Sequence, residues 1–384
     1  MKVAVLGYGT VGAGVYSMLS DAPGMEAGPV LVRPGKAVES FMVSDAALIF
    51  GDPTVDAVVE TLGGLDPAYS YGMRALEAGK HFITANKAMV ASHGLELAAL
   101  AREKGAAFLF SAACGGGVPF LHNLALSAET DRIEAVSGIL NGTTNYMLDA
   151  MQRRGLSYGD ALREAQSLGY AESDPTADVS GLDALRKMQL ACAVAFRVLP
   201  QSGMLCEGME HFTAADVEDI QSRGLVCRLM ARGSRAGESV SAYVEPVLFP
   251  RAAPESSVFT NNNMARYTGK RCGSIVLMGQ GAGRFTTASA VLRDLSAAQQ
   301  GARSMFPENC RAAEADNREA VHSYYIRTGG FAAVRLPLRS VLAQGEVVRA
   351  VTEPMSAEKM HAFAQNIRKD GNDLFFAALE EELC

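Results

Sequence analysis

The first twelve residues place a short apolar run directly before a glycine-rich turn. The run Lys2–Leu6 reads KVAVL, and the turn Gly7–Gly12 reads GYGTVG, with a helical pattern after it. In a Gly-x-Gly-x-x-Gly turn the first glycine allows a tight bend, the second lets a ligand approach the backbone, and the third lets helix and strand pack closely. The spacing alone is a weak signal, but the predicted strand before it and the predicted helix after it strengthen it. The alternative, a glycine turn that binds no ligand, is therefore the less favoured interpretation. We therefore predict that the helix N-terminus binds a dinucleotide pyrophosphate. The predicted contacts are Gly7, Gly9, Thr10, Val11 and Gly12.

Apolar strand-like runs then alternate with helical patterns as far as residue 110. The runs are 29–33, 55–60, 81–84 and 106–110, and helices are expected up to residue 19, over 66–78 and from residue 92. Such alternation is typical of an α/β fold with a doubly wound parallel sheet. The first hundred or so residues are therefore predicted to form a Rossmann dinucleotide-binding domain.

The pattern changes after residue 119. Helices are predicted over 119–128, 143–154, 157–168 and 179–196, strands over 133–139 and 240–248, and loops near 232–239 and 250–257. A second glycine cluster at 279–283 precedes another helix. The tail is predicted to run strand 322–327, helix 336–343, strand 346–351, helix 356–368 and strand 374–379.

These patterns predict three domains. Residues 1–125, completed by about 285–312, would bind the dinucleotide. Residues 126–284 would form a mixed α/β substrate and dimerisation domain, and 320–384 a small α+β module.

Charge and cysteine content exclude several classes of protein. The net charge of −7 argues against a nucleic-acid or anionic-membrane surface. No apolar run approaches the roughly 18 residues of a transmembrane helix, and the N-terminus lacks the features of a signal peptide. The seven cysteines are odd in number and contain no Cys-x-x-Cys pair. We therefore expect no disulfide framework or zinc site, and a reducing, cytoplasmic location.

The end of the second strand bears on the choice between the two nicotinamide dinucleotides. NAD-binding folds place a carboxylate there for the ribose 2′-hydroxyl. This chain has Arg33 and Lys36 and no carboxylate before Glu39. We predict that NADP(H) is preferred, with Arg33 at the 2′-phosphate, and that NAD(H) can also be used. The alternative is that Arg33 is only a solvated strand end.

A second polar constellation lies between two helical patterns. The stretch 169–187 reads GYAESDPTADVSGLDALRK. Asp183 and Lys187 stand four residues apart, on one helix face. A lysine beside carboxylates can hold a substrate hydroxyl or transfer a proton, and the carboxylates can bind an ammonium group. A solvated helix pair worth about 0.3–0.5 kcal/mol is an equally good interpretation of composition alone.

Two further segments follow apolar strands. The stretch 141–146, NGTTNY, places small polar residues at a helix N-terminus, which suits a ligand carboxylate or carbonyl, or simply a cap. The stretch 84–87, TANK, lies just after a strand, at the sheet edge where open α/β folds bind ligands.

Together these segments closely resemble homoserine dehydrogenases. The matching stretches span about residues 1–295 in family order. They are GYGTVG, VDAVVETLGG, TANKAMVASHG, GGGVPF, GILNGTTNYML, LGYAESDPTADVSGLDALRK and GAGRFTTASAV. The longest two are highly specific, because no common fold element generates them.

The resemblance implies NAD(P)-dependent interconversion of aspartate semialdehyde and homoserine, on the route to threonine, methionine and isoleucine. It places the catalytic lysine at Lys187 and a second lysine, near the nicotinamide, at Lys87, and it adds Asp178 to the catalytic set. By the same resemblance, the residues facing the substrate are Glu172, Asp183, Gly142, Thr143 and Tyr170, and further cofactor contacts are Gly281 and Gly283.

The resemblance also implies a site for a sodium-like cation, built from backbone carbonyls of Cys114, Gly116 and Val118. Ser111 stands where the family usually has glutamate, which puts this ion in question.

Many relatives end in a β-α-β-β-α-β amino-acid-binding module. The tail is expected to be a reduced, ACT-like version without strong threonine inhibition, and the protein a homodimer or higher homo-oligomer. The alternatives are a related semialdehyde dehydrogenase and a cofactor-binding pseudoenzyme. The retained acids and Lys187 argue against both.

Overall fold

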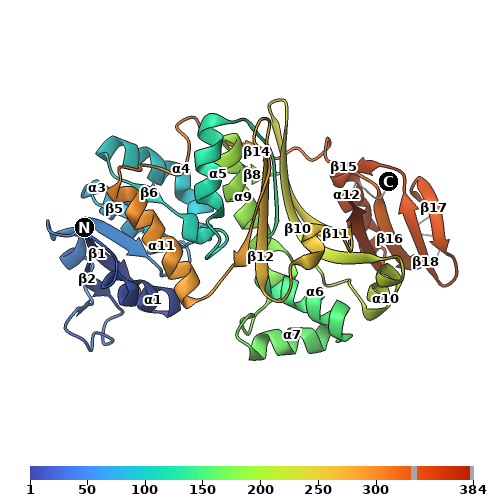
Figure 1. Cartoon of the computed structure of the whole chain (residues 1–384), viewed down its shortest axis with the longest axis horizontal. Helices are drawn as coiled ribbons and strands as arrows, with labels where there is room; N and C mark the ends of the chain where they lie inside the picture. Colours follow the sequence, from blue (N-terminus) through green and yellow to red (C-terminus); the bar gives the residue numbers. More distant parts are fainter. Residues whose placement is uncertain (330–334, 381–384) are drawn as a thin grey trace. The chain divides into compact units, whose positions relative to one another are not determined.

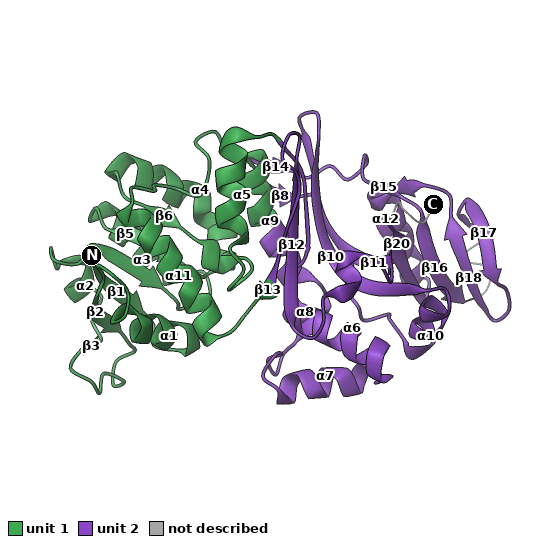
Figure 2. Ribbon diagram, viewed as in Figure 1, with its two compact units in different colours: residues 1–132, 189–199, 279–311 green, residues 133–188, 200–278, 312–384 purple. Residues whose placement is uncertain are grey.

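The computed structural model describes residues 1–329 and 335–380, and its chain divides into two compact units. Unit 1 comprises residues 1–132, 189–199 and 279–311, and unit 2 comprises 133–188, 200–278 and 312–384 (Figure 2). No helix within the described ranges is long and apolar enough to cross a membrane.

Unit 1 is built on a six-stranded sheet whose strands all run parallel. Their order is β3-β2-β1-β4-β5-β6, the Rossmann order. Successive strands are added on one side of β1 up to β3 and on its other side from β4 onward, so the strand order reverses between β1 and β4. The strands are β1 (Lys2–Leu6), β2 (Glu26–Leu31), β3 (Met42–Val43), β4 (Ala57–Glu60), β5 (His81–Thr84) and β6 (Phe108–Leu109). Val3, Val5 and Val58 are completely buried, as expected for a sheet covered on both faces. The predicted α/β dinucleotide-binding fold is confirmed.

The helices of unit 1 connect these strands and are joined by one from late in the chain (Figure 1). α11 (Arg284–Gln299) packs beside α1 (Thr10–Leu19), and a Cβ atom on Gly14 would meet the backbone of Arg284 at 2.8 Å. The others are α2 (Ala47–Phe50), α3 (Ala68–Glu77), α4 (Lys87–Lys104), the 3₁₀ turn η1 (Ser111–Ala113) and α5 (Phe120–Thr130).

Unit 2 contains a ten-stranded mixed sheet that runs through the middle and the end of the chain. Its order is β13-β12-β7-β10-β11-β20-β16-β18-β17, with β9 also paired to β11. The strands are β7 (Ile133–Ile139), β9 (Leu205–Cys206), β10 (Leu225–Ala236), β11 (Ser239–Pro250), β12 (Asn262–Gly269), β13 (Gly273–Gln280), β16 (Tyr324–Gly329), β17 (Leu338–Ala343), β18 (Val347–Thr352) and β20 (Leu374–Leu379). The last four lie in the C-terminal segment, and β20 pairs in parallel with β11. This segment is therefore part of the same sheet as the middle of the chain.

The helices of unit 2 lie between these strands in the sequence. They are α6 (Gly142–Arg154), α7 (Tyr158–Ser167), α8 (Thr176–Val179), α10 (Ala214–Ser222), η2 (Pro254–Ser257) and α12 (Ala357–Lys369). α9 (Leu182–Phe196) begins in unit 2 and ends in unit 1. Two short pairings complete the fold, β8 (Val198–Ser202) with β14 (Arg311–Glu314) and β15 (Val321–His322) with β19 (Met355–Ser356).

Two expectations for local structure are wrong. Residues 338–343, predicted as helix, form the sheet-edge strand β17, paired antiparallel with β18. Residues 232–236, predicted as loop, continue β10, whose partner β11 matches it residue for residue from Leu225 to Ala236. In both cases the partner strand follows directly in the sequence across a short turn, and pairing within this hairpin outweighs local composition. Residues 330–334, where part of the tail prediction falls, lie outside the described residues.

Candidate active site

In unit 1 the glycine turn joins β1 to α1 with the geometry that its spacing predicts. Gly7 has a φ of +99°, a value that favours glycine. A Cβ atom on Gly12 would lie 2.2 Å from the carbonyl oxygen of Gly7, so only glycine fits there. Gly9 precedes the helix as its N-cap without a side-chain cap, and a Cβ atom on it would meet nothing within 4 Å. The turn is therefore closely packed at Gly12 and open at Gly9. Thr10 and Val11 form the first helical positions after it.

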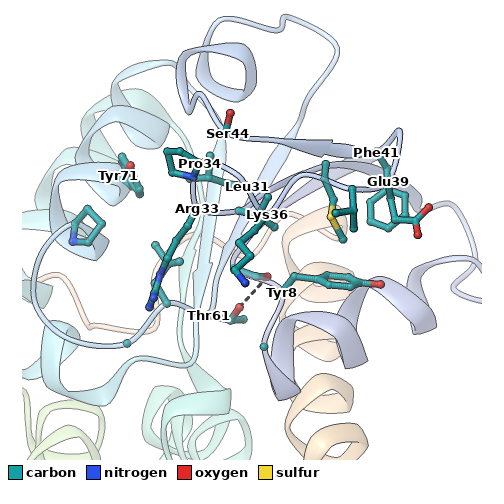
Figure 3. Close-up of a pocket in the computed structure, with 18 of the residues that line it drawn as sticks. Tyr8, Leu31, Arg33, Pro34, Lys36, Glu39, Phe41, Ser44, Thr61 and Tyr71 are labelled. Carbon is teal, nitrogen blue, oxygen red and sulfur yellow. Dashed lines mark hydrogen bonds between the residues drawn. The ribbon is translucent and has the colours of Figure 1, made fainter.

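The open side of this turn faces a cavity of about 1130 Å³. Gly7, Gly9 and Arg33 all line it, so these three predicted cofactor residues share one pocket (Figure 3). Arg33 and Lys36 follow β2, and Figure 3 shows the Lys36 side chain extending toward Thr61, the residue after β4, with the Arg33 side chain to one side of it. Residues that the sequence analysis did not select include Tyr8, Thr61, Leu62, Gly63 and Tyr71. They follow β1 and β4 or lie on α3. The available signals were their position after parallel strands and, for all but Tyr71, the quoted stretches GYGTVG and VDAVVETLGG that contain them.

A buried carboxylate shapes the loop after β4. Glu60 is completely buried and accepts hydrogen bonds from the backbone N–H groups of Leu62 at 2.6 Å and Gly63 at 3.1 Å. Its other oxygen accepts the Thr84 hydroxyl at 2.5 Å, which joins the ends of β4 and β5. This network fixes the loop that forms one wall of the pocket.

Lys87 is the first residue of α4 and lies directly after β5. The side chain of Asn86 caps this helix by accepting the Met89 N–H at 3.2 Å. Lys87 is half-buried. The structure thus places Lys87 in unit 1, at the carboxyl end of the parallel sheet, where the sequence analysis expected a ligand.

The second glycine cluster meets the loop that follows η1. A Cβ atom on Gly116 would lie 2.3 Å from the carbonyl oxygen of Gly281, so the two backbones touch. Gly283 is the N-cap of α11, with a φ of +132°. The Arg293 side chain donates to the carbonyl of Gly117 at 3.0 Å. The three predicted cation ligands, Cys114, Gly116 and Val118, belong to this loop.

Ser111 and Asp294 hold the start of the same loop. The Ser111 hydroxyl donates to one Asp294 oxygen at 2.7 Å, and the Ser111 N–H donates to the other at 2.8 Å. Asp294 is completely buried on α11, and this burial raises the pKa of its carboxyl to about 7, although both hydrogen bonds oppose the rise.

In unit 2 a buried lysine lies at the junction of β7, α6 and α9. Lys187 is 8% exposed, and its Nζ donates to the carbonyl oxygen of Leu140 at 2.6 Å. It also forms an ion pair with Asp183, one turn earlier on α9, at 2.7 Å. The helix face that the i, i+4 spacing predicted is therefore buried, and the solvated-pair interpretation is excluded.

Asn141 joins the carboxylates of this cluster. Its Nδ2 group donates to Asp178 at 2.7 Å and to Asp183 at 2.9 Å. Its Oδ1 atom accepts the Thr144 N–H at 2.8 Å, which caps α6. In the sequence Asn141 is recognisable only as part of a polar helix start, and it is not among the predicted site residues. Its place directly before a helix, in a segment rich in hydroxyl groups, was the available signal.

Burial affects the protonation of this cluster. It raises the pKa of the Asp178 carboxyl above its usual value, and the nearby charge of Asp183 adds to the rise. Hydrogen bonds from Asn141 and Thr143 and the charge of Lys187 act in the opposite direction. The cluster thus holds one ammonium group, that of Lys187, close to the carboxyl groups of Asp178 and Asp183.

The other predicted substrate residues lie at different depths. Thr143 is buried, and its hydroxyl donates to the carbonyl of Tyr170 at 2.6 Å. The Tyr170 ring contacts that of Tyr146 edge-on. Gly142 opens α6, and a Cβ atom on it would lie 2.7 Å from the Asn261 carbonyl. Glu172 is exposed, whereas Lys187 and Asp183 are buried.

Comparison with protein families gives two matches that together cover most of the chain. Residues 7–111 match the model "Homoserine dehydrogenase, NAD binding domain", and residues 119–296 match the model "Homoserine dehydrogenase". The chain belongs to the homoserine dehydrogenase family. The predicted resemblance is confirmed, and unit 1 carries the NAD-binding domain.

Curated homoserine dehydrogenases of bacteria are similar over most of their length. The enzyme of Corynebacterium glutamicum is 38% identical over 314 residues, which are 76% of this chain and 70% of the relative. That of Bacillus subtilis is 34% identical over 319 residues, 79% of this chain and 74% of the relative.

Solved structures extend the likeness to the whole chain. A homoserine dehydrogenase from Thiobacillus denitrificans has a TM-score of 0.87 at 28% identity and covers 99% of this chain and 98% of its own. One from S. aureus at pH 8.5 has a TM-score of 0.77 at 27% identity, with 99% of both chains covered. This homoserine dehydrogenase family member is therefore an oxidoreductase with a nicotinamide cofactor.

Proposed function

We propose that the chain interconverts L-aspartate 4-semialdehyde and L-homoserine with a nicotinamide dinucleotide, in the synthesis of threonine, methionine and isoleucine. The observation that carries the proposal is the buried cluster of Lys187, Asp183, Asp178 and Asn141 in a member of the homoserine dehydrogenase family. A small substrate with an ammonium group and a carbonyl oxygen needs fixed negative charges and a proton donor, and this cluster offers both.

Lys187 is the proposed proton donor. Its Nζ is held by the Leu140 carbonyl and by Asp183. A positioned ammonium group can donate a proton to an aldehyde oxygen in the transition state and accept it in the reverse direction. The cofactor, when bound, supplies the hydride to the carbonyl carbon. The two contacts keep the ammonium in one place, which supplies orientation as well as charge.

The acidic side chains are proposed to bind the substrate. Asp178 and Asp183 would hold its ammonium group, with Asp178 in the catalytic set because Asn141 links it to the carboxylate beside Lys187. Further substrate contacts are assigned to Gly142, Thr143, Tyr170 and Glu172. Glu172 is exposed, so its contact with the substrate would be made from the solvent side.

The cofactor-binding residues are proposed within unit 1. Gly7, Gly9, Thr10, Val11 and Gly12 would bind the pyrophosphate through the helix N-terminus, with Gly281, Gly283 and Lys87 adding contacts to the cofactor. We propose a preference for NADP(H) over NAD(H). Arg33 and Lys36 line the pocket and bring two positive charges to it, which suits a 2′-phosphate.

A monovalent cation is proposed at the carbonyls of Cys114, Gly116 and Val118. Backbone oxygens suit such a hard cation and do not depend on the glutamate that Ser111 replaces. The positive φ angles of Gly115 and Gly116, +91° and +52°, turn the backbone sharply here. Thermal unfolding in sodium or tetramethylammonium chloride of equal concentration tests this site; equal melting temperatures would argue against it.

We further propose a cytoplasmic homodimer. β13 lies at one end of the unit 2 sheet and exposes Ile275, Val276 and Met278, an apolar edge that a second copy could cover. The odd number of cysteines and the lack of a Cys-x-x-Cys pair support the reducing, cytoplasmic setting. Sedimentation equilibrium checks the dimer, and a monomer at micromolar concentration would contradict it.

The reaction itself is tested with the purified chain. We expect L-aspartate 4-semialdehyde to drive oxidation of NADPH and L-homoserine to drive reduction of NADP⁺, both followed by absorbance. A wild-type chain that binds NADPH but turns over neither substrate would reject the proposed function and favour the pseudoenzyme.

A further inference from the structure

A carboxylate outside the proposed substrate site is held by the C-terminal helix. Glu207 follows β9 and is 8% exposed. Arg368, in the last turn of α12, donates to both of its oxygens, at 2.9 Å and 2.6 Å. The same guanidinium donates to the carbonyl of Leu374, at the start of β20, at 2.8 Å. Two-point contacts of this kind fix orientation as well as distance.

The segment 206–209, which contains Glu207, packs directly against the turn between α8 and α9. The Met209 N–H donates to the Val179 carbonyl at 2.9 Å, and the Cys206 thiol donates to the Ser180 carbonyl at 3.1 Å. A Cβ atom on Gly208 would lie 2.2 Å from the Val179 carbonyl oxygen, so the two backbones touch. No side chain larger than hydrogen separates them at that point.

That turn connects the two acidic side chains of the site. Asp178 lies on α8, just before Val179, and Asp183 lies in the first turn of α9. Gly181 stands between them with a φ of +83°, and a Cβ atom on it would meet the Cys206 sulfur at 3.1 Å. Movement of the 206–209 segment would therefore displace the backbone that carries both carboxylates.

Among the described residues, short strand pairing and one further backbone hydrogen bond join this segment to the sheet. β9 is only two residues long, and its pairing with β11 matches Leu205 and Cys206 to Tyr243 and Val244. One further backbone hydrogen bond runs from the Glu207 N–H to the Val244 carbonyl, at 2.8 Å. The ion pair with Arg368 supplies the link from this segment to α12 and β20.

We propose that Glu207 and Arg368 are positioning residues, through which helix α12 of the C-terminal segment sets the placement of Asp178 and Asp183. The inference rests on the proposed function, because it assigns these carboxylates to the substrate. Neither Glu207 nor Arg368 touches the reacting atoms. Their effect is on substrate affinity, transmitted through a packed segment whose other attachments are few.

The test compares Glu207→Gln with Glu380→Gln. Glu380 is a matched control, because it also forms an ion pair between the C-terminal segment and the sheet, with Arg232 at 2.5 Å, but it lies outside the 206–209 segment. We expect Glu207→Gln to raise the KM for aspartate semialdehyde roughly 3- to 30-fold and to leave the KM for NADPH unchanged. Glu380→Gln should change neither, and Arg368→Lys, which keeps the charge, should give an intermediate KM.

Hydrogen exchange gives a second readout that needs no turnover. We expect faster exchange of the amides of Val179, Ser180 and Gly181 in Glu207→Gln, and wild-type exchange there in Glu380→Gln. Equal behaviour of the two variants in both measurements, or an unchanged substrate KM in Glu207→Gln, overturns the inference. A wild-type chain without turnover would reject the proposed function, while the exchange comparison would still decide whether the ion pair holds the turn.

Discussion

Asn141 organises the proposed substrate site at the scale of a single residue. Its amide donates to two carboxylates, while its carbonyl oxygen caps α6. Both functions use the fixed geometry of one planar amide, so the helix start and the acidic cluster are positioned together. An aspartate at this place could cap the helix, but it would add a third negative charge where two are already close.

The Arg33 side chain is predicted to select the cofactor. We expect Arg33→Ala to raise the KM for NADPH about 10- to 100-fold, the effect of losing one or two hydrogen bonds to a charged group. The KM for NADH, which lacks the 2′-phosphate, should change little. Steady-state kinetics with both cofactors measures this, and equal changes for the two would show that Arg33 does not contact the phosphate.

Asp294 is predicted to make stability depend on pH. Its carboxyl has a pKa of about 7 in the folded chain, against about 3.9 in an unfolded one. Between these values the folded state holds a proton that the unfolded state has lost, so stability falls as pH rises from about 4 to 7.

The measurement is urea unfolding of the wild type and Asp294→Asn at pH 5 and pH 8. We expect the wild type to lose roughly 1 to 3 kcal/mol more than the variant over this range. Asparagine has nearly the same volume but does not titrate in this range, so it is the matched control. Parallel losses would mean that Asp294 does not titrate in this window.

At the scale of elements, different glycines of the turn between β1 and α1 serve ligand binding and folding. A methyl group on Gly9 would meet no protein atom within 4 Å, whereas one on Gly12 would overlap the Gly7 carbonyl. We expect Gly9→Ala to change stability by at most ~1 kcal/mol, yet to weaken NADPH binding at least tenfold by blocking the approach of the pyrophosphate.

Gly12→Ala, in contrast, is expected to destabilise the fold itself by about 1–3 kcal/mol or more. Thermal unfolding and NADPH fluorescence titration of both variants distinguish the two effects. Tight NADPH binding by Gly9→Ala would show that the cofactor does not approach the turn at this residue.

Sequence patterns predicted elements well where local signals and final contacts agree. The strand at 133–139 has the predicted bounds, and the helix expected over 143–154 is α6, Gly142–Arg154. The sequence patterns failed for β17. Around Arg339 and Ser340 apolar and polar residues do not alternate clearly, and the pairing with β18 defines the strand. β12 and β13 were not predicted. β12 is rich in polar residues and is a strand through its pairing with β7, whereas the apolar run 275–278 in β13 was an available strand signal that was missed.

The same limit applies to the site. The spacing of Asp183 and Lys187 predicted a shared helix face, but burial and the contact with Leu140 required the fold. Thr61 lies in the quoted stretch VDAVVETLGG but was not selected as a site residue, and Tyr71 lies in none of the quoted stretches; both line the cofactor pocket because the parallel sheet brings their segments together.

At the scale of the whole molecule, the C-terminal segment continues the sheet of unit 2. Its strands follow the order β20-β16-β18-β17, and β20 adds them to β11. Within the described residues α12 is its single helix, whereas two helices were expected, and the reduced ACT-like module stays a prediction.

We predict that threonine has little effect on turnover. The segment carries no glycine-marked ligand turn that the sequence analysis could identify, so a site for the amino acid is not expected. Initial rates with and without several millimolar L-threonine measure this. Inhibition that saturates in the millimolar range would show that an effector site is present.

The most direct test of the proposed chemistry is the turnover of Lys187→Ala. Lys80→Ala is the matched control, because Lys80 is also buried and donates to two backbone carbonyls, those of Asp52 and Val55. We expect Lys187→Ala to bind NADPH normally but to lower kcat for aspartate semialdehyde about 100- to 10,000-fold, the usual contribution of a positioned proton donor. Lys80→Ala, if folded, should keep its kcat. An unchanged kcat in Lys187→Ala would contradict the assignment of Lys187 as proton donor.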